Sequence, residues 1–140
     1  MIVLSGGSSF VLRLERGEEI HETLKAFARD KGIEGAVVSG IGAVQSAELG
    51  FYHLDRQEYE RRALPEITEL LSLQGNLCLL EGKPFLHAHV VLMKSDFTLA
   101  GGHLFAATIA VTGEFHIQPT ESMVRLPDPK VGLPLLNCPL

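Results

Sequence analysis

Tryptophan, long apolar runs and basic clusters are all missing from this chain of 140 residues. No apolar run reaches the roughly 20 residues that a membrane-spanning helix needs, so we expect no membrane span. The first residues have neither a basic lead nor an apolar stretch typical of a signal peptide, and the expected location is therefore the cytoplasm.

Cysteine is also scarce. Cys78 and Cys138 are the two cysteines, and they lie far apart without forming a C-x-x-C pair. This spacing excludes the usual redox motif and the usual structural zinc motif. We expect both residues to be free thiols with structural roles.

Positive charge is limited too. The formal net charge is −5, and the longest basic cluster is the doublet Arg61-Arg62, which has acidic residues on both sides. Proteins that grip a phosphate backbone normally present a basic face, because neutralised phosphates supply most of the non-specific affinity. The charge pattern therefore argues against direct DNA binding.

The length and the 46% hydrophobic content suit one compact domain with a real core. No linker, charge block or internal repeat divides the chain. We predict a single domain over residues 1–140, with its core at about 10–120. A proline-rich tail follows at about 127–140.

One helix is predicted, over residues 18–31. Ile20, Leu24, Phe27 and Ala28 recur at helical spacing, and Gly32 is a typical helix end. His21 lies beside this apolar stripe, and we expect it at the solvated surface.

The rest of the chain predicts strands separated by Gly, Pro or polar turns. The expected strands cover residues 10–15, 36–44, 48–54, 58–63, 67–73, 76–80, 85–93, 98–105 and 109–117. This pattern indicates an α+β fold, a mostly antiparallel multi-stranded sheet with the helix packed on one face. Several strands are apolar on both faces, so another layer or another subunit should cover the remaining apolar surface.

Three histidines form the most informative pattern. His87 and His89 are two apart on one expected strand and share a face, and His103 follows Gly101-Gly102 on the next strand. Three neutral imidazoles that converge can hold a divalent transition metal, zinc first, with one position left open. A metal-free polar pocket and ordinary hydrogen-bonded histidines are the alternatives.

The pairing of these strands depends on the turn between them. A three-residue loop at residues 94–96, with Asp96 left-handed, would place His87 opposite His103 and His89 opposite Gly101. The two glycines would then leave space for a metal or a ligand. A loop one residue longer or shorter would turn His103 to the other face.

Other candidate residues are weaker. His53 and His116 are secondary candidates as ligands, and Glu81 and Glu114 are candidate general bases beside a metal. Ser39 would act as a nucleophile only with a base nearby.

The segment Gly40-Ile41-Gly42 lacks the third glycine and the following helix of a dinucleotide-binding loop. Close approach of two backbones is the use that we expect for its glycines.

Taken in order, five segments resemble the PPC domain, the plant-and-prokaryote-conserved domain of AT-hook nuclear proteins and of free-standing prokaryotic proteins. The segments are residues 38–44, 48–52, 69–76, 85–89 and 100–104, and the resemblance runs from about Phe10 to Thr120. It implies an α+β fold, a compact homotrimer and a metal site at His87, His89 and His103.

In plants this family is linked to DNA binding and transcriptional regulation, and its domain associates with itself and with other proteins. This chain has no Arg-Gly-Arg-Pro AT-hook. Two hypotheses follow. The first is a homotrimeric, non-enzymatic module with a regulatory role, and the second is a metal-dependent enzyme or sensor that acts on a small molecule.

Overall fold

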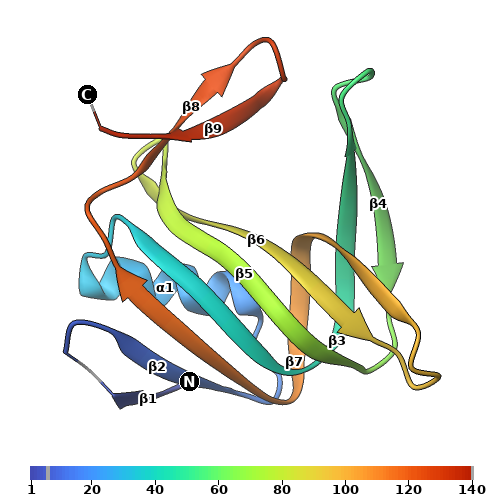
Figure 1. Cartoon of the computed structure of the whole chain (residues 1–140). Coiled ribbons are helices and arrows are strands. Elements are labelled where there is room, and N and C mark those ends of the chain that lie inside the picture. The colour runs from blue at the N-terminus through green and yellow to red at the C-terminus, as the bar shows by residue number, and fades with distance from the viewer. Residues whose placement is uncertain (6, 140) are drawn as a thin grey trace.

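A computed structural model describes residues 1–5 and 7–139 of the chain. In this part the structure contains one helix and a nine-stranded sheet, which confirms the α+β class (Figure 1). The elements are β1 (Ile2–Ser5), β2 (Phe10–Glu15), α1 (Ile20–Lys31), β3 (Ala36–His53), β4 (Glu58–Leu64), β5 (Thr68–Leu80), β6 (Lys83–Met93), β7 (Leu99–Pro119), β8 (Val124–Asp128) and β9 (Leu133–Asn137).

Helix α1 follows the sequence prediction closely. The Glu19 side chain caps its start by accepting a hydrogen bond from the Glu22 N–H (2.7 Å), and Gly32 ends it in the left-handed conformation (φ 64°). The predicted apolar stripe is buried, with Leu24 and Ala28 fully inaccessible to solvent. The helix begins two residues later than predicted, because the side chain of Glu19 serves as the cap.

Three strands are longer than the sequence indicates. β3, β5 and β7 each join segments that we predicted as separate strands, and the register shifts within each of them. Such bulges let a ladder bend and continue past a polar or glycine position. Gly40 lies at one of them, where an added Cβ would come within 2.4 Å of the Phe115 ring. The predicted close approach of two backbones is found at Gly42 instead, where an added Cβ would overlap the Thr112 carbonyl oxygen.

The β6–β7 turn differs from the prediction by one residue at each end. Lys94 pairs with Thr98 (N···O 2.9 Å), so the three-residue loop is 95–97, and Phe97 rather than Asp96 is left-handed (φ 64°). The Asp96 carboxylate instead accepts hydrogen bonds from the Thr98 N–H and hydroxyl. Because both ends shift together, every residue keeps its predicted face.

The predicted proline-rich tail is in fact a hairpin of β8 and β9. β8 joins the sheet in parallel with β5, through Leu79↔Val124 and Leu80↔Arg125. Its partner strand β9 lies on the outer side, and Pro127 pairs with Pro134 within the hairpin. The hairpin and the β3–β4 arm project on the same side of the sheet (Figure 1).

The core lies between α1 and the sheet and includes Leu12, Phe27, Leu73 and Phe115. Other apolar strand residues face outward and no layer of this chain covers them among the described residues; Val111 is 66% exposed and Phe51 is 67% exposed. No helix in the described residues is long and apolar enough to cross a membrane.

Candidate metal centre

The structure brings the three predicted histidines together. One nitrogen from each of His87, His89 and His103 lies within 4.8 Å of the other two. The ring centroids are 5.1 Å apart for His87–His89, 5.1 Å for His87–His103 and 5.5 Å for His89–His103.

Strand geometry explains this convergence. On β6, Leu86, Ala88 and Val90 point into the core, so the two histidines between them share the opposite face. His103 on β7 pairs with His89 rather than with His87, because the turn lies one residue further along than predicted. His87 is therefore the diagonal member of the group.

The neighbouring glycines have a different role from the predicted one. A Cβ added to Gly101 would come within 2.9 Å of the Val90 carbonyl oxygen, and one added to Gly102 within 2.7 Å of the Gly50 carbonyl oxygen. They permit close packing of neighbouring strands. The prediction that they leave space for a metal is wrong.

The site favours neutral imidazoles. Burial lowers the pKa of His87 from 6.5 to about 4, and the Arg125 charge adds to this effect. Burial likewise lowers the pKa of His103 to about 4, with smaller contributions from the other imidazoles and Arg125. The Nδ1 atom of His103 is buried and has no hydrogen-bond partner among the described residues. Neutral rings and an unpartnered ring nitrogen are what a metal ligand requires.

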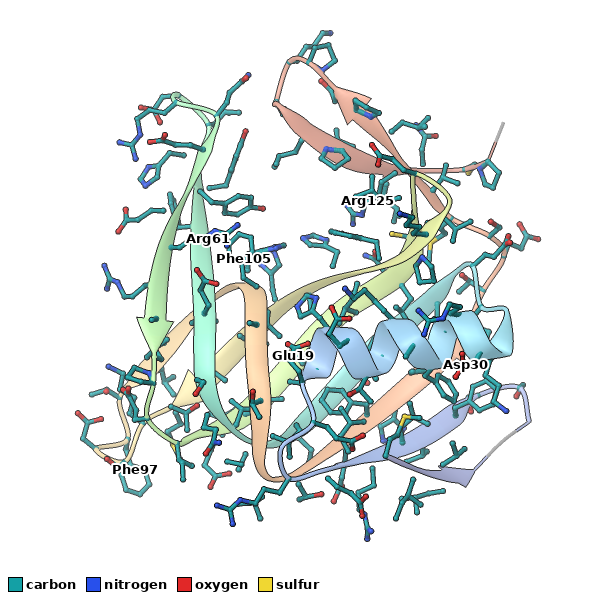
Figure 2. All side chains as sticks on the ribbon, turned by 180° about the vertical axis from the view of Figure 1, so that it is seen from behind. Glu19, Asp30, Arg61, Phe97, Phe105 and Arg125 are labelled. Carbon is teal, nitrogen blue, oxygen red and sulfur yellow. The ribbon has the colours of Figure 1, made fainter. Side chains whose placement is uncertain are left out.

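Aromatic side chains surround His103. The Tyr59 ring lies 5.0 Å from it and the Phe105 ring lies 4.7 Å from it, measured between centroids. The Arg61 guanidinium covers the other side of Phe105, at 3.7 Å from the ring centre (Figure 2). Packing of this kind fixes the orientation of an imidazole before any ligand binds.

Two residues near the site were not expected there from the sequence. His21, predicted to be solvated, is half-buried, and its Nε2 lies 3.1 Å from the Leu104 carbonyl oxygen. Arg125 lies beside the site because the β8–β9 hairpin packs against β5. Nothing in the local sequence indicates either position, since both depend on contacts between distant segments.

The weaker candidates lie elsewhere. His53 pairs with the Glu60 carboxylate (3.0 Å), whereas Ser39 and His116 face each other at the far end of the β3–β7 ladder from His103. Glu81 lies in the β5–β6 turn, and Glu114 pairs with Ile41 on the same far part of β7. The cluster in the described residues consists of histidines and includes no carboxylate.

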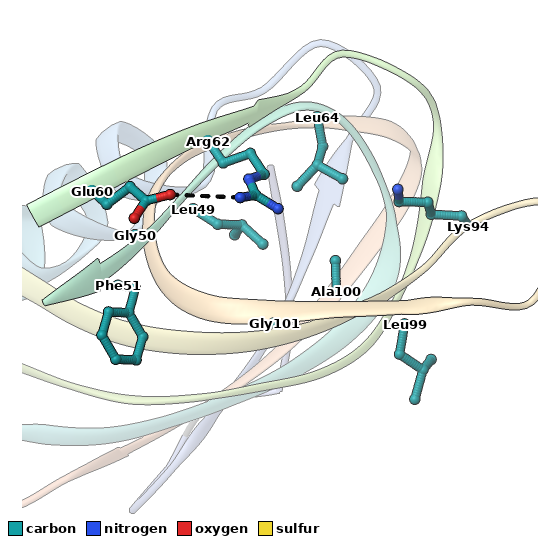
Figure 3. A pocket seen from close by; sticks show the side chains of 10 residues that line it. All are labelled: Leu49, Gly50, Phe51, Glu60, Arg62, Leu64, Lys94, Leu99, Ala100 and Gly101. Carbon is teal, nitrogen blue, oxygen red and sulfur yellow. Dashed lines mark ion pairs between the residues drawn. The ribbon is translucent and has the colours of Figure 1, made fainter.

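A separate hollow of about 550 Å³ lies on the other face of the β3–β4 arm (Figure 3). Leu49, Phe51 and Leu99 give it apolar walls, and Arg62 pairs with Glu60 at its rim (3.5 Å). Because Leu49 and Arg62 alternate with Gly50 and Arg61 along their strands, this hollow does not open onto the histidines.

The residues present fit a divalent transition metal. Three imidazoles from adjacent strands match the ligand set of an open zinc site, in which a fourth position remains for water or another ligand.

Comparisons with known proteins support this description. A Pyrococcus horikoshii plant- and prokaryote-conserved (PPC) protein is 33% identical, with a TM-score of 0.87 over 99% of this chain and 96% of that chain. A metal-containing protein from Archaeoglobus fulgidus is 39% identical, with a TM-score of 0.85 over 92% of each chain. A candidate DNA-binding protein from Bacteroides thetaiotaomicron is 28% identical, with a TM-score of 0.92 over 97% of this chain and 96% of that chain.

A search of the curated proteins found no match. Residues 1–121 match the family described as the Plants and Prokaryotes Conserved (PCC) domain, which is also written PPC. This match covers most of the chain, and the resemblance expected from the five sequence segments is confirmed. The chain therefore belongs to the PPC domain family.

Proposed function

We propose that this protein is a metal-binding module in which His87, His89 and His103 hold a divalent transition metal, zinc first. The observation that carries the proposal is the convergence of the three imidazoles, one of them with a buried nitrogen that lacks a partner. The metal-containing relative at 39% identity adds support. Binding is favoured over catalysis, because neither Glu81 nor Glu114 joins the cluster as a general base.

Metal content tests this proposal. Protein purified without an affinity tag should contain close to one metal ion per chain, and His87→Ala and His103→Ala should lose most of it. His53→Ala is a matched control, because His53 lies outside the cluster and pairs with Glu60. Equal metal in all four proteins would overturn the proposal.

We also propose that the module is a homotrimer. The support is the apolar surface on the outward faces of the strands, which water would otherwise cover. This surface comprises Val37, Ile41, Phe51, Leu71, Leu99 and Val111. Binding to other proteins is proposed as well, on the ground of the family resemblance alone.

Light scattering after gel filtration tests the assembly, and a trimer should have three times the 15.2 kDa mass of the chain. Val111→Asp should reduce this mass, since it places a charge on the exposed apolar surface. Arg29→Gln, on the exposed side of α1, changes the net charge by the same amount and should leave the mass unchanged. A monomeric wild-type protein would refute the trimer.

For regulation of transcription, we propose a role through a partner protein in the cytoplasm rather than direct contact with DNA. Two relatives, at 28% and 27% identity, are described as candidate DNA-binding proteins. This chain, however, has a net charge of −5 and no basic cluster beyond Arg61-Arg62. A duplex-DNA titration at low salt should show no binding, and salt-dependent binding would contradict this view.

A further inference from the structure

The Arg125 guanidinium is a half-buried charge with an unused donor. Its Nη1 donates to the Pro134 carbonyl oxygen (2.9 Å), and its Nη2 donates to Asn76 Oδ1 (3.2 Å). Its Nε is buried and has no partner. No carboxylate within residues 1–5 and 7–139 forms an ion pair with Arg125. A buried charge without a counter-charge is costly unless a ligand neutralises it.

This guanidinium lies beside the histidine site. Asn76, which it contacts, is the partner of His87 in the β5–β6 ladder. The Phe85 ring, on the same strand face as His87, lies 5.5 Å from the guanidinium carbon. Figure 2 shows Arg125 near the base of the β8–β9 hairpin, and Arg61 and Phe105 on the side of the β3–β4 arm.

Arg125 brings a positive charge to the edge of the histidine cluster, and no carboxylate belongs to that cluster among the described residues. A divalent ion would add two further positive charges. A ligand that fills the open position of this site should therefore be an anion.

We propose that the histidine site takes a small organic carboxylate and that the Arg125 guanidinium binds it. The inference rests on the metal site proposed above. A carboxylate matches a guanidinium in charge and in hydrogen-bond geometry. The rings of Phe85 and Tyr59 provide an apolar surface for the organic part of the ligand, whereas phosphate would gain nothing from them.

Cobalt provides the assay, because the visible absorption of Co²⁺ responds to a ligand at its open position. The full-length protein loaded with Co²⁺ is titrated with benzoate, with phosphate and with chloride. We expect benzoate to change the spectrum, and Arg125→Gln to weaken benzoate binding at least about tenfold. Arg62→Gln is the matched control, because Arg62 lies on the other face of the arm and should leave benzoate binding unchanged within about twofold.

Co²⁺ affinity separates ligand binding from structural damage. Removing the Arg125 charge should strengthen Co²⁺ binding while it weakens benzoate binding, whereas a loosened β8–β9 hairpin would weaken both. Arg125→Lys keeps the charge but loses the fixed geometry, and it should give intermediate benzoate binding.

Four results would overturn the inference. Co²⁺ binding without any response to benzoate would refute the carboxylate proposal and leave the metal-site proposal intact. A benzoate response that Arg125→Gln does not weaken would have the same two consequences. Phosphate that binds more tightly than benzoate would refute the assignment of an organic carboxylate. Absence of Co²⁺ binding would overturn the metal site and the inference together.

Discussion

The lowered pKa values of His87 and His103 predict that the metal site tolerates acid. A histidine with the ordinary pKa of about 6.5 loses about thirtyfold in its neutral fraction at pH 5, so two of them together would weaken metal binding about a thousandfold. With each pKa at about 4, as burial sets it here, the neutral fraction at pH 5 remains about nine-tenths. The contribution of these two rings to metal affinity should then change less than about twofold between pH 7 and pH 5.

Competition with a chelator of known Zn²⁺ affinity, repeated from pH 7 to pH 5, measures this dependence. The His89→Ala variant isolates the contribution of the other two rings, since any proton competition at His89 disappears with its side chain. Circular dichroism at each pH verifies that the protein stays folded. A loss approaching a thousandfold in this variant at pH 5 would refute the argument that burial keeps the two imidazoles neutral.

Three further predictions concern stability. Because burial lowers the pKa values of His87 and His103, the unfolded chain binds more protons than the folded chain between pH 6.5 and pH 4. The free energy of unfolding of the metal-free protein should therefore fall by about 3 kcal/mol over this window, once solvent screening is allowed for. A urea midpoint that stays constant across this pH range would refute the prediction. Gly40→Ala should cost about 1–3 kcal/mol, since its Cβ would overlap the Phe115 ring, and Phe115→Leu in the same chain should recover part of this loss in a double-mutant cycle. Glu19→Ala should lower the free energy of unfolding by about 1–2 kcal/mol, because it removes the acceptor for the Glu22 and Ala107 N–H groups. Glu19→Gln keeps an acceptor, so equal unfolding midpoints for the two variants would contradict the capping role.

Local signals made part of the structure predictable from sequence. The stripe of apolar residues and the terminal Gly32 located α1, because capping and helical spacing are properties of neighbouring residues. The alternation of side chains along β6 correctly predicted that His87 and His89 share one face. The predicted face of His103 is also correct, although the β6–β7 turn is shifted, because both ends of the turn moved by one residue.

Other features depended on contacts that the sequence does not encode locally. Bulges extend β3 and β7 beyond the predicted breaks, since their partner strands continue on either side. Pairing with β5 turns the proline-rich segment into a hairpin and places Arg125 beside the histidines. No local pattern predicts this pairing, because it joins residues that are far apart along the chain.

The position of the β8–β9 hairpin affects how this protein should be truncated. The conserved-domain match ends at residue 121, whereas Arg125 and the Tyr52 contact with Val131 lie beyond that limit. A fragment cut at the end of the match would retain all three imidazoles but lose the guanidinium and the strand that carries it. Chain boundaries taken from the domain match would thus keep the three proposed metal ligands while removing the guanidinium that we propose binds the carboxylate.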